Sequence, residues 1–178
     1  MARMQLGSNI VIPAIQVGSN EVAGYTIADN GTANAVSGEV VIKGVTVAEY
    51  RSFFYRFAGC GGMSKISFPD LLKIELQGLQ RVCSDCPSLS VAEFPKLHTL
   101  ANSALTGAFN SDAALQEMWF PALRNVASGA FGTSSLCFAK CTGLIAIHFP
   151  AAIQSMIEST TGYASKFGAS NATIYFDL

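Results

Sequence analysis

Apolar residues recur along this chain at a long and regular interval. The dipeptide Phe-Pro occurs at positions 68, 94, 120 and 149, so that successive copies are 26, 26 and 29 residues apart. Phe176 continues the series 27 residues after Phe149. The residues around each Phe follow the pattern FxxCxxLxxIxFPxLxxI, as in "FAKCTGLIAIHFPAAI" from Phe138 to Ile153. This periodicity predicts similar structural units, each packed against its neighbours.

The piece IxF of this pattern has the period of a β-strand. Its two apolar residues lie on one face of a short strand, and the residue between them points to the opposite face. The proline that follows has no N–H to give to a sheet, so it ends the strand. Stacking of such units predicts parallel strands with apolar side chains inward.

Two columns of residues should then point outward on the stacked strands. The residues between the two apolar positions form the first column, which consists of Ser67, Glu93, Trp119, His148 and Tyr175. The residues two positions earlier form the second column, which consists of Lys65, Val91, Glu117, Ala146 and Thr173.

The copies "FAKCTGLIAIHFPAAI", "FAGCGGMSKISFPDLLKI" and "CSDCPSLSVAEFPKLHTL" resemble the BspA-like subclass of leucine-rich repeats. The resemblance covers about residues 40–178 and implies a β-rich repeat solenoid of about five coils. In that fold parallel strands are stacked from coil to coil, with short helical or irregular connections between them. Members of the subclass are common on the surface of bacteria, which favours an adhesion-type protein at the cell surface.

Some copies depart from the pattern. The third has Asp112 where the others have a cysteine, and the last has lost its Phe, Cys and Leu together, at Ser165, Gly168 and Asn171. Such degeneration is typical of a terminal repeat. We expect the apolar end of this last coil to be covered, either by a homodimer through the C-terminal coil or by residues 155–166 folding over it, an insertion suggested by the 29-residue interval.

Residues 1–39 do not fit the repeat. Their glycines separate short β-type runs such as "NIVIPAIQV", which predicts an N-terminal segment of short strands. This segment either caps the solenoid or attaches it to a larger assembly. Residues 48–60, "AEYRSFFYRFAGC", have aromatic residues at helix-like spacing and predict a short helix or a 3₁₀ turn.

The composition narrows the possible partners. Half of the residues are hydrophobic, 13% are charged and the net charge is −1, so there is no basic surface for nucleic acid. No stretch approaches the length of a membrane span, and no convincing signal peptide precedes the repeats. We therefore expect a soluble protein, either cytoplasmic or exported without a Sec signal, although the resemblance suggests the cell surface.

The cysteines invite a chemical interpretation. Cys83 and Cys86 form a CxxC pair, a spacing known from redox and zinc sites. Cys60, Cys86 and Cys141, however, occupy one repeat position, which favours a structural column of buried thiols. Motifs typical of hydrolases, metalloproteases and nucleotide-binding enzymes are absent from the sequence. We expect no catalysis, metal or cofactor.

The sequence thus favours a non-enzymatic binding module. Its only tryptophan, Trp119, points outward beside His148 and Tyr175, an aromatic run suited to stacking on a sugar ring or to anchoring a protein ligand. Glu93 and Glu117, together with Lys65 of the second column, would add polar contacts on the concave face. Two alternatives stay open. These residues can be ordinary solvent-facing strand positions, and the protein can be a structural or phage-tail-associated assembly module.

Overall fold

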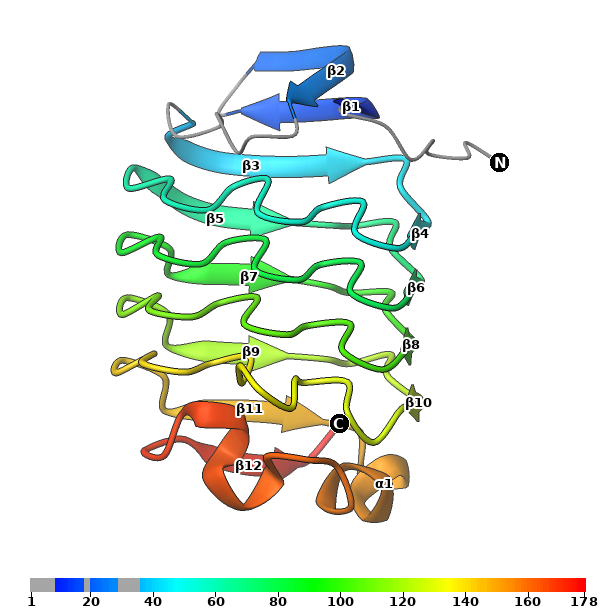
Figure 1. Cartoon of the computed structure of the whole chain (residues 1–178), viewed down its shortest axis with the longest axis vertical. Helices are drawn as coiled ribbons and strands as arrows, with labels where there is room; N and C mark the ends of the chain where they lie inside the picture. The colour runs from blue at the N-terminus through cyan, green and yellow to red at the C-terminus, as the bar shows by residue number, and fades with distance from the viewer. Residues whose placement is uncertain (1–8, 18–19, 29–35) are drawn as a thin grey trace.

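The computed structural model describes residues 9–17, 20–28 and 36–178, and side chains from Val36 onward. In this part of the chain the strands form two sheets, mostly with parallel neighbours, and there is little helix (Figure 1). The long sheet has 8 strands in the order β12-β11-β9-β7-β5-β3-β1-β2, and the short sheet has 4 in the order β10-β8-β6-β4.

The units that begin with β3, β5, β7 and β9 each give one strand to each sheet, whereas β11 and β12 extend only the long sheet. The long sheet contains β1 (Asn9–Val17), β2 (Asn20–Ala28), β3 (Gly38–Lys43), β5 (Met63–Ser67), β7 (Val91–Glu93), β9 (Glu117–Trp119), β11 (Ala146–Phe149) and β12 (Thr173–Phe176). The short sheet contains β4 (Val47–Ala48), β6 (Lys73–Ile74), β8 (Thr99–Leu100) and β10 (Asn125–Val126). The parallel strands predicted from the IxF pattern are confirmed, and the chain has a β-rich repeat fold.

The apolar positions of the repeat form the core. The Phe of each Phe-Pro pair stacks on its counterpart in the next unit, with ring centroids 5.4–6.2 Å apart along the series Phe68, Phe94, Phe120, Phe149 and Phe176. The first four of these rings are at most 1% exposed. Contacts between aromatic rings at these distances stabilise the folded state beyond the contribution from burying the apolar area of the rings. This column fixes the register of the units relative to one another.

A turn-rich segment closes each unit on the side opposite the long sheet (Figure 1). Of the two alternatives predicted for residues 48–60, the helix is wrong. The segment is a series of single turns closed by hydrogen bonds of the 3₁₀ type, such as that from the N–H of Phe54 to the carbonyl of Arg51, and Arg51 and Tyr55 have φ of 52° and 56°. The N–H of Phe53 donates to the carbonyl of Gly78 in the next unit, and that of Phe57 donates to Val82. Since these amides bond between units, no α-helical ladder can form within the segment.

The sequence suggested that the additional residues of the 29-residue interval lie at 155–166. The structure places them elsewhere. Hydrogen bonds between neighbouring units link residues 25 positions apart at Leu105 and Ala130, but 28 positions apart at Gly107 and Ser135. The three extra residues therefore lie between Ala130 and Ser135. They form a wider loop on the turn-rich side, and the strands on either side keep their pairing.

The last unit contains the helical turns η2 (Ala151–Ile153), α1 (Gln154–Glu158) and η3 (Tyr163–Gly168). Residues 155–166 form the connection that leads to β12 and pack against the preceding unit. The N–H of Thr161 donates to the carbonyl of Ser128, and the ring of Phe167 stacks on that of Phe131 at 4.2 Å. In β12, Ile174 and Phe176 stay half-buried.

At the other end of the sheet, β1 pairs antiparallel with both β2 and β3. The long sheet is continuous across the boundary expected at residue 39, because β3 begins at Gly38. Parts of the predicted N-terminal segment, residues 1–8, 18–19 and 29–35, lie outside the described residues. Helices long and apolar enough to cross a membrane are missing from the described part of the chain.

Candidate functional site

The outward columns of the long sheet hold the candidate site. Strand pairing places Glu93 beside Trp119, Trp119 beside His148, and His148 beside Tyr175, in the register expected from the repeat. Ser67 pairs with Glu93 at the start of this column. Because the strands are parallel and in register, side chains from units 26–29 residues apart become direct neighbours.

Three aromatic rings of this face form a ladder. The indole of Trp119 lies 3.7 Å from the His148 ring with an angle of 2° between their planes, and His148 lies 4.9 Å from Tyr175 at 12°. Trp119 and Tyr175 are each 42% exposed, whereas His148 is 8% exposed because the other two rings cover it. The stack holds Trp119 in one orientation with one of its faces covered.

Asp177 completes the ladder, and the sequence did not single it out. Its carboxylate lies 3.0 Å from Nδ1 of His148 and orients that ring between its two neighbours. Asp177 directly follows β12, so that it lies one residue beyond the end of the strand and two residues after Tyr175. A carboxylate just beyond the last strand, one unit away from a histidine, is the signal that could have revealed it.

The polar residues of the site are paired within the face. Nε1 of Trp119 donates a hydrogen bond to Oε2 of Glu117 at 3.1 Å. Lys65 and Glu93 form an ion pair at 2.8 Å between β5 and β7. The six candidate residues therefore form two groups: Trp119, His148, Tyr175 and Glu117 at β9–β12, and Lys65 with Glu93 at β5–β7.

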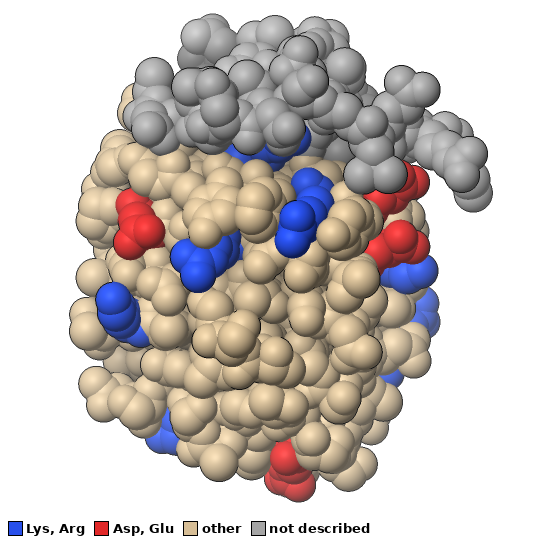
Figure 2. All heavy atoms as spheres, viewed as in Figure 1, with Lys and Arg blue, Asp and Glu red and all other residues tan. Residues whose placement is uncertain are grey.

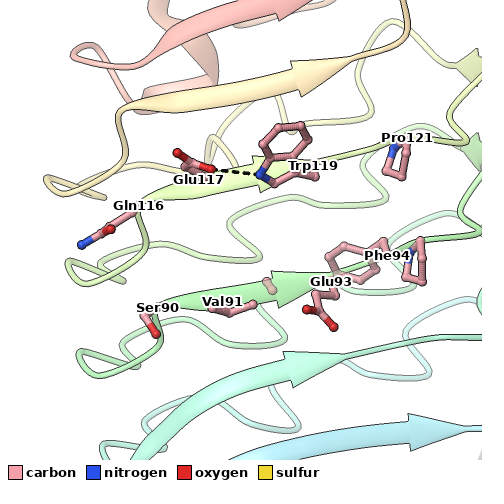
Figure 3. A pocket seen from close by; sticks show the side chains of 10 residues that line it. Ser90, Val91, Glu93, Phe94, Gln116, Glu117, Trp119 and Pro121 are labelled. Carbon is pink, nitrogen blue, oxygen red and sulfur yellow. Dashed lines mark hydrogen bonds between the residues drawn. The ribbon is translucent and has the colours of Figure 1, made fainter. Parts of the chain in front are cut away.

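A groove separates the two groups. It has a volume of about 610 Å³ and runs over β7 and β9, as Figure 3 shows. Glu93 and Val91 line it from β7, while Glu117 and Trp119 line it from β9. At its two ends lie the polar pair Ser90 and Gln116 and the exposed prolines Pro95 and Pro121. Sequence reasoning missed these end residues, because the prolines were interpreted only as strand terminators.

On the face seen in Figure 2 most Lys, Arg, Asp and Glu side chains are scattered, and acidic and basic side chains lie next to one another at the right edge. Among the described residues, no group of three or more His, Cys, Asp or Glu side chains is arranged to hold a metal ion. The groove is therefore the strongest candidate for ligand binding.

The cysteines lie inside the fold. All five are buried and free of disulfides, and the Sγ atoms of Cys86 and Cys141 donate to the carbonyls of Phe57 and Phe109 at 3.0 and 2.8 Å. Burial raises the pKa of Cys83 and Cys137, and it raises that of Cys141 to about 12. These three thiols are protonated and weakly nucleophilic at neutral pH, which supports a packing role.

Comparisons with known proteins add little to this geometry. No protein-family model matches the chain, and no curated protein matches it significantly. Among solved structures, the chain is similar to a leucine-rich repeat protein of T. pallidum at 17% identity and a TM-score of 0.35. The match covers 66% of each chain, so it spans just under two thirds of that protein. A likeness this low carries no argument about fold or function.

Proposed function

We propose that this chain is a non-enzymatic binding module, built as a BspA-like leucine-rich repeat solenoid of about five coils. In this proposal its ligand is a protein or a glycan, bound on the concave face of the long sheet and centred on Trp119 and His148. The repeat periodicity and the in-register stack of parallel strands support the solenoid. Residues 40–178 make up its coils, and β1 and β2 cover the edge of the first one.

One observation carries the proposed function. Trp119 keeps 42% of its surface exposed although it is the largest side chain of the face, and both His148 and Glu117 hold it in place. An exposed aromatic ring that is already ordered loses little conformational entropy when it binds a ligand. Such rings are enriched at the energetic centres of binding sites.

The substitution Trp119→Ala tests the proposal. We expect a ligand found on an array of glycans and proteins to lose at least about tenfold in affinity, because aromatic anchors typically contribute more than 1 kcal/mol. The melting temperature should change little, since Trp119 is outside the core. Tyr50→Ala is the matched control, because Tyr50 is also 42% exposed but lies in a turn-rich segment. A large loss of stability in Trp119→Ala would show instead that this ring is part of the core.

A second candidate function is assembly, as expected for a structural or phage-tail-associated module. It is favoured by β12, the last strand of the described sheet, where Ile174 and Phe176 are half-buried. A second copy of the chain on this edge would bury them further in a homodimer. Sedimentation equilibrium over a range of concentrations tests this, and a monomer at every concentration would refute it.

A further inference from the structure

We propose that the groove between Glu93 and Trp119 binds the guanidinium group of an arginine side chain on a protein partner. This inference rests on the proposed function and deepens it by naming the chemistry of the ligand. It follows from three features of the groove: which hydrogen-bonding groups remain available, how the charges balance, and which face of the indole is open.

The polar groups that face the groove are mostly acceptors. The donor of Trp119 is used by Oε2 of Glu117, and the hydroxyl of Ser90 donates to the carbonyl of Ser64 at 3.1 Å. Among the described residues, Oε1 of Glu117 and Oε2 of Glu93 have no hydrogen-bond partner. The amide of Gln116 is the one side-chain donor left, at the end of the groove. A ligand that fits must therefore bring donors, and guanidinium has five donors and no acceptor.

The charges of the site require a single cation. Glu93 and Glu117 are the charged residues that line the groove, and Lys65 beside it already pairs with Glu93. One negative charge, that of Glu117, is left without a cation. Anionic ligands such as phosphates or acidic sugars would be repelled by this carboxylate. A polycation would bring more positive charge than the one free carboxylate can balance.

The indole offers a flat surface at the same place. His148 covers one face of Trp119, and strand pairing puts Glu93 on the opposite side, across the groove. A planar cation on this open face would extend the ladder that begins at Tyr175 and His148. Tryptophan is the best partner for such cation–π contacts, and guanidinium combines stacking with bidentate pairing to a carboxylate. The methylene groups of the side chain would contact Val91, which is 39% exposed.

Neutral sugars and lysine fit less well. A sugar hydroxyl both donates and accepts hydrogen bonds. The amide of Gln116 is the one side-chain group of the groove that could donate to it. A lysine ammonium is a strongly hydrated point charge that stacks poorly on an indole. Of these ligands, only arginine supplies several hydrogen-bond donors, carries a single positive charge and presents a planar group to the indole.

Fluorescence titration tests the inference, because Trp119 is the only tryptophan of the chain. The probes are three capped tripeptides, Gly-Arg-Gly, Gly-Lys-Gly and Gly-citrulline-Gly. Citrulline has nearly the shape of arginine but no charge. We expect saturable quenching by the arginine peptide and binding of the citrulline peptide weakened by about tenfold or more. Raising the salt concentration should weaken binding of the arginine peptide more than binding of the uncharged citrulline peptide.

Two variants locate the binding. Glu117→Gln removes the unpaired charge but keeps an acceptor for Nε1 of Trp119, so we expect about a tenfold loss of arginine-peptide affinity. Glu75→Gln removes an exposed carboxylate that pairs with Lys73 elsewhere, and it should leave the affinity unchanged. Equal losses in both variants would overturn the inference, because they would show only a general effect of net charge.

Failure of this inference can be told apart from failure of the proposed function. If arginine and citrulline peptides bind alike, or if the arginine peptide gives no saturable signal, the guanidinium site is refuted. A glycan or another protein that still requires Trp119 would then leave the proposed function standing. If no ligand from the arrays depends on Trp119, both proposals fall.

Discussion

Asp112 stands where neighbouring repeat units have a cysteine, and its replacement by asparagine should stabilise the protein at neutral and basic pH. The carboxyl group is fully buried. Its Oδ1 accepts a hydrogen bond from the N–H of Cys86 at 2.8 Å, but Oδ2 has no hydrogen-bond partner. Burial raises the pKa of Asp112 from 3.8 to about 8; the hydrogen bond from Cys86 opposes this rise, and the charge of Asp85 adds to it.

The direction of the pH dependence follows from these two values. Between pH 3.8 and about 8 the unfolded chain releases the proton of Asp112, whereas the folded chain keeps it. Stability is therefore full below pH 3.8 and falls as the pH rises toward 8. Since a tenfold change in proton affinity corresponds to about 1.4 kcal/mol, the titration of this residue lowers the free energy of unfolding by an amount on the order of 5 kcal/mol across that range.

Urea denaturation at several pH values between 4 and 8 measures this effect. Asp112→Asn keeps an acceptor for Cys86 and removes the titration, so the gain over the original chain should grow as the pH rises. Asp112→Cys restores the residue of the other units and should give the same trend. Glu158→Gln, an exposed carboxylate in α1, is the control and should not change the pH dependence. Parallel stability curves for Asp112→Asn and the original chain would refute the reasoning.

Three further substitutions test other parts of the fold. Ser111→Gly should raise the free energy of unfolding in urea by about 0.5 kcal/mol, because Ser111 has a φ of 69° and Gly59 occupies the equivalent position of an earlier unit; a decrease would show that φ carries no strain. Phe120→Ala should lower the melting temperature sharply, with a loss of about 3–5 kcal/mol, since its ring is fully buried between stacked neighbours; a loss below about 1 kcal/mol would contradict the stacked core. Lys96 lowers the pKa of Asp70, so Asp70 stabilises the fold above its ordinary pKa and loses this contribution as the pH falls. In Lys96→Met an NMR titration should show a higher pKa for Asp70, with stability changed by less than about 1 kcal/mol because the pair is exposed; an unchanged pKa would contradict the pairing.

The strand register could be predicted from the sequence because it depends on a strict local rule. Side chains alternate between the two faces of a strand, so the position of Phe120 in the pattern determines that Met118 points inward and Trp119 outward. The repeat then places Trp119 beside His148 without further information. The sequence alone therefore predicts which residues are neighbours in the outward columns, but it does not predict that Ser67, Ala146 and His148 are buried there.

The backbone of the turn-rich side could not be predicted in the same way. Aromatic residues at positions 50, 53, 54 and 57 have helical spacing, and the left-handed residues Arg51 and Tyr55 carry none of the usual glycine signal. Hydrogen bonds to the neighbouring unit decide the conformation, and these depend on the stack as a whole. Local propensity is overruled here by contacts between units.

The shape of the candidate site also depends on interactions beyond the repeat pattern. Trp119 could have leaned toward Glu93, which is its neighbour on the other side. Stacking on His148 draws it toward β11 instead, the hydrogen bond to Glu117 holds the indole along its own strand, and Lys65 holds Glu93 toward β5. The groove exists because the two groups are drawn apart, a consequence of side-chain orientations that no spacing in the sequence specifies.

This architecture separates the residues that stabilise the fold from those available for recognition. Inward positions must match from unit to unit because each ring packs on its counterpart, and Asp112, a carboxyl group at a position where other units have a cysteine, has one buried oxygen without a partner among the described residues. Outward positions have no such requirement, so a serine, a carboxylate and a tryptophan follow one another in a single column. A ligand site can therefore arise on this face by changing outward residues alone. Trp119→Ala and Asp112→Asn should consequently act independently, the first on binding and the second on stability.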